Sequence, residues 1–565
     1  MSIHRARQLR RIRRTLTPLA LLVLVQSAVA QQLPGAGGQL LQIPPSPVQP
    51  RAAPQVRIEQ RNKTTPPATD EVKVRVQSLR VTGATVFSQP DLLALTGFVP
   101  GTQLSLSQLQ AMAARITAHY RSRGYFVALA YVPAQEISDN AVTIAVSEGR
   151  YGSIAVRNST NLSEGIAQGA LQGLNGGDYI LQEPLESRLL VLSELPGVVV
   201  SSTLAPGVVA GTSDLLVDIT PGARFSGSVD ADNAGNRYTG QYRVGATLNL
   251  NNPLGLGDVA SLRLLTSGSG LHYARASWQR QLGRGTVGVA YSWLDYELGK
   301  EFAPLQAHGS ARVASVFGRY PIERSRSSNL YAQLNYDWKS FNDRVDSTGG
   351  ETDRKSGVLT ASLFGDRTDT WGGGGYTTYL AALSSGVLDI ETPAARAADA
   401  LTARSDGSFG KLAFNASRVQ RLGAGPFSVY GSISGQVASK NLDSSEKMVL
   451  GGMNAVRAYP EGEAYADEGV LLNLELRYDL AKPATLPGYM QLVAFVDAGS
   501  VTTNHSPWVA GTNHRTLSGA GFGLNWADPG NFQVRTYYAH KLGNQIATSA
   551  PDRSGRFWVQ MVKYF

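Results

Sequence analysis

Two short motifs toward the C-terminus carry side chains that could form an ion pair. The first, residues 451–460, is predicted to be a loop because paired glycines, an asparagine and a proline surround Arg457 and Tyr459. The second, residues 495–499, ends an alternating strand whose apolar side chains share one face, so Asp497 points to the opposite face. If the apolar face meets lipid, Asp497 faces the lumen of a barrel. An arginine that a long loop carries into this lumen would meet a carboxylate, and the sequence therefore predicts Arg457 with Asp497 as the functional centre.

Motifs that would indicate an enzyme are incomplete. Residues 444–447 satisfy the S-x-x-K pattern but have no accompanying K-T-G. Residues 230–235 begin like a calcium-binding loop, yet Gln241 stands where the twelfth position needs glutamate. Residues 519–523 imitate a dinucleotide-binding loop, but no helix is predicted after them. The sequence therefore predicts no catalytic residue, no metal site and no cofactor, and the chain is expected not to be an enzyme.

The N-terminus and the composition restrict the cellular compartment. Residues 1–30 are predicted to be a signal peptide, with six arginines, a short apolar core and the cleavage site Ala28-Val29-Ala30. Removing those six arginines lowers the formal charge from +9 to +3, which takes away the main argument for a nucleic-acid partner. The 565 residues include no cysteine, so disulfides and cysteine-ligated metal sites are excluded. No apolar run beyond the signal peptide has the length of a transmembrane helix, so a membrane role must come from strands.

The segment between the signal peptide and residue 72 is predicted to be a linker or mobile tail. Residues 31–71 are rich in proline, glycine and glutamine and cannot bury much surface. Residues 38–42 could form a short helical turn, although the composition favours disorder. From residue 72 the pattern becomes strand, two helices and two strands, and it recurs after residue 150. Residues 72–149 and 150–222 are therefore predicted to be two α+β domains in tandem, an arm suited to binding something extended.

Residues 223–565 are predicted to form a transmembrane β-barrel. Glycine and aromatic residues are abundant, and segments of about ten residues alternate between apolar and polar side chains, which is the pattern of outer-membrane strands. At roughly 20 residues per strand and loop, the region holds about 16 antiparallel strands. A β-sandwich array or a propeller would need a shorter repeat. Neither explains the last strand, whose apolar face ends on the aromatic Phe565.

The two tandem units resemble the polypeptide-transport-associated (POTRA) domains that precede outer-membrane barrels, through Arg123-Gly124-Tyr125 and Ser147-Glu148-Gly149. Nearly the whole mature chain is similar to the two-partner secretion transporters of the TpsB type, the haemolysin-activator and filamentous-haemagglutinin transporter family. The motifs that carry this second resemblance lie in the barrel region: residues 232–235, 252–258, Val456-Arg457-Ala458-Tyr459 and Phe495-Val496-Asp497-Ala498-Gly499. Ala458 stands where the family usually has glycine.

The resemblance implies a location and a function. The barrel would lie in the bacterial outer membrane, in contact with its lipid, and the POTRA domains would lie in the periplasm. These domains would capture a large unfolded partner protein, which the barrel would secrete. The loop with Val456, Arg457 and Tyr459 would fold into the barrel, and Arg457 would contact Asp497. Some relatives have a plug helix before the first POTRA domain, so residues 31–71 could include one, and the barrel assembly machinery would be a partner during biogenesis.

Two other functions stay open on the sequence. An assembly factor that inserts other barrels belongs to the same superfamily, but such factors commonly carry more than two POTRA domains. A passive porin or an adhesin would leave both the arm and the pair of Arg457 with Asp497 unexplained.

Overall fold

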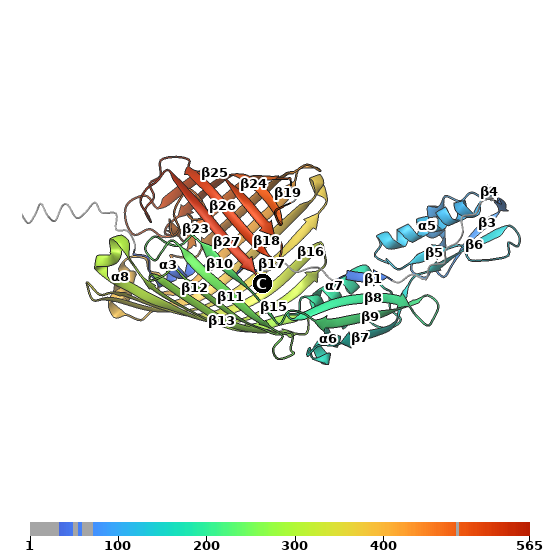
Figure 1. Cartoon of the computed structure of the whole chain (residues 1–565), viewed down its shortest axis with the longest axis horizontal. Helices are drawn as coiled ribbons and strands as arrows, with labels where there is room; N and C mark the ends of the chain where they lie inside the picture. Colours follow the sequence, from blue (N-terminus) through green and yellow to red (C-terminus); the bar gives the residue numbers. More distant parts are fainter. Residues whose placement is uncertain (1–32, 49–54, 59–71, 482–484) are drawn as a thin grey trace, which may run out of the picture.

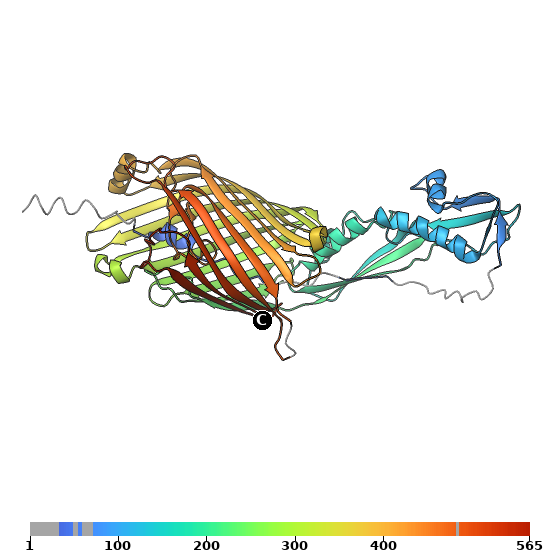
Figure 2. The same cartoon turned by 90° about the horizontal axis from the view of Figure 1, so that it is seen from above.

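The computed structural model describes residues 33–48, 55–58, 72–481 and 485–565. The predicted signal peptide, residues 1–30, lies outside the described residues. A barrel forms one end of the molecule and an arm of two smaller domains forms the other, as Figures 1 and 2 show from two directions. Among the described residues, no helix has both the length and the apolar character needed to cross a bilayer.

Within the described ranges, sixteen antiparallel strands close into the barrel, which confirms the predicted fold class. They follow one another around the ring in chain order, and the barrel closes where β10 pairs with β27. The strands are β10 (Phe225–Asp232), β11 (Arg243–Asn251), β12 (Val259–Thr266), β13 (Leu271–Leu282), β14 (Gly285–Glu297), β15 (Ala307–Arg324), β16 (Ser328–Val345), β17 (Gly350–Asp369), β18 (Gly375–Ile390), β19 (Gly407–Arg421), β20 (Phe427–Ala438), β23 (Glu468–Asp479), β24 (Tyr489–Thr502), β25 (His514–Asp528), β26 (Phe532–Lys541) and β27 (Gly555–Tyr564).

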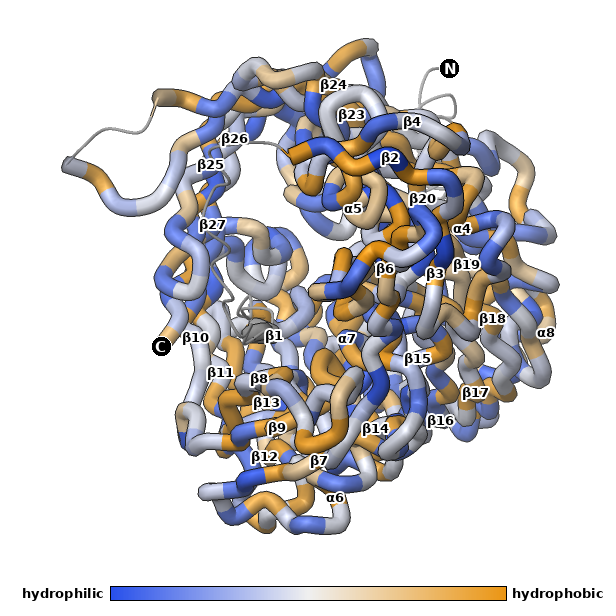
Figure 3. Tube along the Cα trace, turned by 90° about the vertical axis from the view of Figure 1, so that its right-hand side faces the viewer, coloured by the Kyte–Doolittle hydropathy of each residue, from blue (hydrophilic) through white to orange (hydrophobic). Residues whose placement is uncertain are grey.

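The alternation read from the sequence separates two faces of the barrel wall. On β23, Leu472 and Leu474 are 48% and 50% exposed, whereas the intervening Asn473 is 9% exposed and Glu475 is 5% exposed. Figure 3 shows hydrophilic and hydrophobic residues alternating along the barrel strands. The outer face is therefore suited to lipid, and the polar inner face surrounds a lumen.

The arm consists of two α+β units. The first contains β2 (Val74–Val76), β3 (Ser78–Thr82), α4 (Gln89–Thr96), β4 (Thr102–Leu104), α5 (Leu106–Ser122), β5 (Leu129–Tyr131) and β6 (Ala141–Ser147). The second contains β7 (Arg150–Asn158), α6 (Glu164–Ala170), α7 (Gln182–Ser193), β8 (Val198–Pro206) and β9 (Thr212–Pro221). We call them domain 1 and domain 2. Domain 2 lies next to the barrel and domain 1 lies at the tip of the arm (Figures 1 and 2).

Local sequence signals explain the helices of domain 1. The Ser88 side chain accepts a hydrogen bond from the backbone N–H of Asp91 and caps α4. Ser105 and Gln108 form a reciprocal capping box at the start of α5. After α5, Gly124 has a φ of +90°, a backbone conformation that favours glycine. The sequence predicts caps at Ser88, at Ser105 or Ser107, and at Gly124, and the structure uses Ser105 of the two serines.

A buried carboxylate fixes the end of domain 1. Glu148 accepts hydrogen bonds from the backbone N–H of Thr85 at 2.7 Å, from the N–H of Val86 at 2.8 Å, and from the hydroxyl of Tyr120 at 2.8 Å. Burial alone would raise the pKa of Glu148, but the hydrogen bonds to its ionised form outweigh this effect and lower the pKa. The charged form of Glu148 therefore stabilises the domain.

We expect Glu148→Gln to lower the unfolding free energy of domain 1 by about 1–3 kcal/mol, because an amide cannot accept from all of these donors. Since the folded pKa is lowered, the stability from this carboxylate is present above its unfolded pKa and is lost as the pH falls through the folded pKa. Hydrogen exchange of domain 1 in the full chain at neutral and acidic pH measures both effects. Glu136→Gln, at an exposed position, is the matched control. Equal protection in parent and Glu148→Gln would contradict this account.

Domain 2 is joined to the rim of the barrel by polar contacts. The side-chain amide of Asn161 donates to the main-chain carbonyl of Asn252 at 3.0 Å, and the side-chain amide of Asn252 donates to the side-chain oxygen of Asn161 at 2.9 Å. Arg324, at the end of β15, donates to Glu194 at 2.7 Å. These contacts fix domain 2 against the barrel.

The structure corrects three expectations. The segment before residue 72, expected to be disordered, contains α3 (Ala36–Leu41) and β1 (Gln55–Ile58). The single strand expected from residue 72 is two strands, β2 and β3, and β4 was not predicted. The sequence suggests no helix within residues 223–565, yet α8 (Pro393–Leu401) and two short 3-10 helices, η1 (Lys300–Leu305) and η2 (Trp371–Gly373), lie between the barrel strands. Each of these short elements is stabilised by tertiary contacts and not by a long periodic pattern in its own sequence.

Candidate functional site

The long connection between β20 and β23, residues 439–467, folds back into the barrel lumen, and we call it the luminal loop. It contains a small hairpin, β21 (Met448–Val449) and β22 (Tyr465–Ala466). Val456, Ala458 and Tyr459 have no exposed surface. They pack against inward-facing side chains of the last barrel strands, including Leu517 and Trp558. The predicted loop motif is therefore buried inside the barrel.

The structure brings Arg457 and Asp497 together. The Arg457 guanidinium donates to both Asp497 oxygens, from Nε at 2.9 Å and from Nη2 at 2.7 Å. The backbone N–H of Arg457 donates to the same carboxylate at 3.0 Å. Nη1 donates to Glu475 at 2.7 Å, a second carboxylate that the sequence reasoning did not single out. The Arg457 side chain is 4% exposed and the Asp497 side chain has no exposed surface, so charge-assisted bonds replace water around both groups.

Aromatic side chains enclose the same arginine. The guanidinium carbon lies 3.5 Å from the ring centroid of Phe495 and 5.0 Å from that of Tyr537. The indole N–H of Trp558, on the last strand, donates to the Arg457 carbonyl at 2.7 Å. A planar guanidinium can stack and bind a carboxylate at once, which a lysine ammonium cannot do. The geometry of the site therefore favours arginine over lysine.

Three alternate residues of β24 hold the luminal loop through three different contacts. Phe495, Asp497 and Gly499 all point into the lumen, because they are two positions apart on one strand. Phe495 stacks on Arg457 and Asp497 pairs with it. Gly499 leaves room for Leu450, since a Cβ at this position would lie 2.3 Å from the Leu450 Cδ1 atom.

Similar close packing surrounds the rest of the motif. A Cβ at Gly519 would lie 2.5 Å from the Cβ of Ala458, so the alanine that replaces the usual glycine is accommodated by a glycine on β25. Ala458 does not have a positive φ. The Tyr459 hydroxyl donates to the Gln545 carbonyl at 3.2 Å, and the Lys541 ammonium lies 4.7 Å from the Tyr459 ring centroid.

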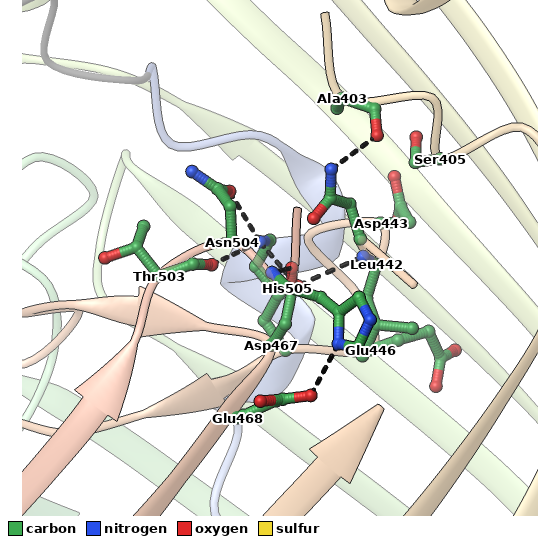
Figure 4. Close-up of polar contacts among 12 residues, drawn as sticks. Ala403, Ser405, Leu442, Asp443, Glu446, Asp467, Glu468, Thr503, Asn504 and His505 are labelled. Carbon is green, nitrogen blue, oxygen red and sulfur yellow. Dashed lines mark hydrogen bonds and ion pairs between the residues drawn. The ribbon is translucent and has the colours of Figure 1, made fainter. Parts of the chain in front are cut away.

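A second group of contacts fixes the base of the luminal loop at the end of the barrel away from the arm. Asp467 accepts from the N–H of Leu442 at 3.0 Å, from the N–H of His505 at 2.9 Å, and from the Lys447 ammonium at 2.6 Å. The His505 ring also lies 2.6 Å from Glu468 (Figure 4). The Asp467 side chain has no exposed surface. Both ends of the luminal loop are thereby held against the connection between β24 and β25, residues 503–513.

The S-x-x-K segment also has a structural role. Glu446 is bound by Lys339 and Lys411 from two wall strands, and Lys447 binds Asp467. The acidic residues of 230–235 are likewise paired with arginines, Asp230 with Arg263 and Asp232 with Arg243. Residues 519–523 lie in β25, which agrees with their interpretation from the sequence as a glycine-rich strand rather than a dinucleotide-binding loop.

The short helix α3 lies inside the barrel, where Figures 1 and 2 show it among the strands. Ala36 and Gln39 have no exposed surface. At its start, the backbone N–H of Ala36 donates to Asp343 at 2.8 Å. At its end, Arg243 donates to the Gln42 carbonyl at 2.8 Å. Luminal groups therefore hold both ends of α3, which explains why a segment of such composition is helical.

Asp343 links α3 to the luminal loop. Besides Ala36, its carboxylate accepts from the Tyr296 hydroxyl at 2.7 Å and binds Arg354. Arg354 also binds Asp443 in the first arm of the luminal loop. A cavity of about 470 Å³ borders these groups and α3. One arginine on the wall thus connects the helix and the loop.

The C-terminal strand completes the barrel. Phe565 is 56% exposed, and its backbone N–H donates to the Gly227 carbonyl at 3.1 Å. The ring lies so close to Gly227 that a Cβ there would be 2.6 Å from the Phe565 ring. Lys563 reaches Asn531 in the turn between β25 and β26, which agrees with a snorkelling position at the membrane interface.

Comparison with known proteins decides the family. The sequence profile of the haemolysin secretion/activation proteins ShlB/FhaC/HecB matches residues 211–526, and the profile of the ShlB-type POTRA domain matches residues 74–149. The chain belongs to this haemolysin secretion/activation family. The barrel therefore lies in the outer membrane and the POTRA domain lies in the periplasm. The end of the barrel with α8 is extracellular.

Individual relatives agree with this assignment. The heme/hemopexin transporter protein HuxB of Haemophilus influenzae is 31% identical over 474 residues, which cover 82% of each chain. The outer membrane transporter CdiB of Dickeya dadantii is 24% identical over 440 residues, 75% of each chain. Among solved structures, CdiB from Escherichia coli has the same fold, with a TM-score of 0.66, 21% identity, and coverage of 89% of this chain and 93% of that chain.

Proposed function

We propose that this protein secretes one large partner protein through its barrel, as the transporter of a two-partner secretion system. Domains 1 and 2 capture the partner in an unfolded form in the periplasm, because an exposed sheet edge can pair with an extended segment whatever its side chains. The partner then threads through the lumen. Folding of the partner outside the cell supplies the direction of transport.

The observation that supports the proposal most directly is that two segments, the luminal loop and α3, occupy the lumen. The luminal loop is held by Arg457, and α3 is held by Asp343 and Arg243, all through non-covalent contacts. We propose that α3 acts as a plug and that the luminal loop sets the gate. A passive porin would need neither, nor would it need the periplasmic arm.

An assembly factor for other barrels is the second candidate. This candidate is supported by the architecture of a POTRA arm and a sixteen-stranded barrel, which such factors share with this chain. The described part of the arm holds two α+β units, fewer than such factors commonly carry, so we favour the transporter.

A comparison of culture supernatants and outer membranes from parent and deletion strains tests the proposal. We expect one or a few large proteins to disappear from the supernatant of the deletion strain, while the other barrel proteins keep their levels in the outer membrane. Re-expression of this chain should restore the missing proteins. A joint fall of many barrel proteins would instead show an assembly factor.

A further inference from the structure

Two arginines meet at the joint between domain 2 and the barrel. Arg188 lies on α7 of domain 2, which packs against β15 of the barrel (Figure 1). Arg284 lies in the turn between β13 and β14, and its guanidinium donates to the hydroxyl of Ser187, next to Arg188, at 3.4 Å. Within the described ranges, the Nε atom of each arginine is buried and has no hydrogen-bond partner. The joint therefore holds two arginines with unused donors.

The charges of these two arginines are not balanced by the carboxylates around them. Glu186 and Glu194 of domain 2 each bind a different arginine near the end of β15. Burial lowers the pKa of Arg188, and the positive charge of Arg284 lowers it further. Because arginine stays protonated in proteins, the two like charges repel each other. An anion bound between them would remove this repulsion and accept their free N–H groups.

An apolar groove begins beside the two arginines and crosses the outer face of the barrel wall from β13 to β19. Its volume is about 700 Å³. Tyr320, which lines the groove, is 50% exposed, and the guanidinium carbon of Arg284 lies 5.9 Å from its ring centroid. Since the turn between β13 and β14 is on the side of domain 2, this end of the groove lies at the periplasmic surface of the membrane. Tyrosine is enriched at such membrane–water interfaces.

Large and small side chains alternate along the groove. Gly318, Leu334, Ala361 and Leu383 are successive cross-strand neighbours on the outer face of β15 to β18. The two leucines are 54% and 61% exposed. A Cβ at Gly318 would meet only Val287, at 4.0 Å, so the space above this glycine is open. The leucines therefore form walls beside the small residues, and a hydrocarbon chain fits between them.

We propose that the two arginines and the groove form a binding site for an anionic phospholipid of the inner leaflet. The phosphate accepts hydrogen bonds from Arg188 and Arg284, and one acyl chain lies in the groove. Because Arg188 belongs to domain 2 and Arg284 to the barrel, the bound lipid joins the two and fixes the arm against the barrel. This inference needs only the outer-membrane location of the barrel and does not depend on the export function.

Titration of the purified full chain with phosphatidylglycerol, followed by native mass spectrometry, tests the headgroup contacts. We expect the parent to bind one phosphatidylglycerol at least about tenfold more tightly than phosphatidylcholine, whose headgroup has no net charge. Arg188→Gln and Arg284→Gln should each weaken this binding about tenfold, since each removes charge-assisted bonds. Arg367→Gln is the matched control and should bind like the parent, because Arg367 is an exposed residue near the periplasmic end of β17 that does not line the groove.

A second pair of variants tests the groove and leaves both arginines in place. Ala361→Phe fills the groove and should also weaken the binding of phosphatidylglycerol at least about tenfold. Ala246→Phe makes the same change at an exposed position on β11, outside the groove, and should have no effect. A change of gel mobility on heating shows for every variant that the barrel is folded.

Several results would overturn the inference, and none of them bears on export. Equal binding of phosphatidylglycerol and phosphatidylcholine by the parent, or undiminished binding by the variant that combines Arg188→Gln with Arg284→Gln, would remove the anionic headgroup site. Weakening by Arg284→Gln alone would remove the bridge to domain 2. A dimer in the same spectra that is lost in Ala361→Phe would show that a second copy of the chain covers the groove in place of a lipid.

Discussion

We expect Arg457→Ala to lower export of the partner protein strongly while the barrel remains inserted in the outer membrane. The substitution leaves Asp497 and Glu475 buried without their cation, and breaking a buried pair in this way costs about 3–5 kcal/mol. It also removes the stacking on Phe495. The luminal loop then loses its docked position, so export should fall at least about tenfold, since 1.4 kcal/mol already changes an equilibrium tenfold. Quantifying the partner in culture supernatants and the barrel in outer membranes measures both results.

Further variants separate the role of the guanidinium from that of charge. Arg457→Lys keeps the charge but not the bidentate and stacked geometry, and it should restore only part of the export. Asp497→Asn should reproduce most of the Arg457→Ala loss. Arg396→Ala is the control, because Arg396 lies on the extracellular helix α8 and its side chain and that of Asp389 are both about half exposed. Unchanged export from an inserted Arg457→Ala barrel would remove the gating role.

We expect Asp343→Ala to open the channel. The aspartate holds the first N–H of α3, the Tyr296 hydroxyl and Arg354, so its removal also weakens the link from Arg354 to the luminal loop. Hydrogen bonds to a charged group contribute about 1.5–3 kcal/mol. The equilibrium between bound and released α3 should therefore shift by about 10–100-fold toward release. Conductance of the purified barrel in a planar bilayer reports this release as longer or more frequent open states.

A matched variant and a deletion complete this experiment. Asp346→Ala changes the same residue type three positions away, in an exposed pair with His308, and should leave the conductance at the parental level. Deletion of residues 36–41 should give the largest conductance, because no helix is left to occupy the lumen. If Asp343→Ala and the deletion both conduct like the parent, α3 is not a plug.

The sequence predicted the parts of the site that follow from strand alternation. Period two is a local property, so the inward direction of Asp497 could be read directly from its apolar neighbours. The same pattern on β23 places Glu475 on the luminal side, and this signal could have identified the second carboxylate. The number of strands was predicted from the length of residues 223–565, at roughly 20 residues per strand and loop.

Features that depend on distant contacts were not predicted. α3 has the composition of a flexible segment, and its helix depends on Asp343 and Arg243, which are far away in sequence. β1 has four residues, and its partner strand β8 belongs to another domain. The base of the luminal loop is held by single residues such as Asp467, whose three partners come from separate positions in the chain. Local patterns carry no information on such pairings.

The central claim is that the partner protein passes through the lumen of this barrel. The measurement that tests it most directly places a photo-crosslinker at Ser362 of β17, on the luminal face, and at its neighbour Leu363, which is 49% exposed on the outer face. During export, illumination should trap the partner at position 362 and not at position 363. Export that proceeds without any crosslink from the luminal position would contradict the account.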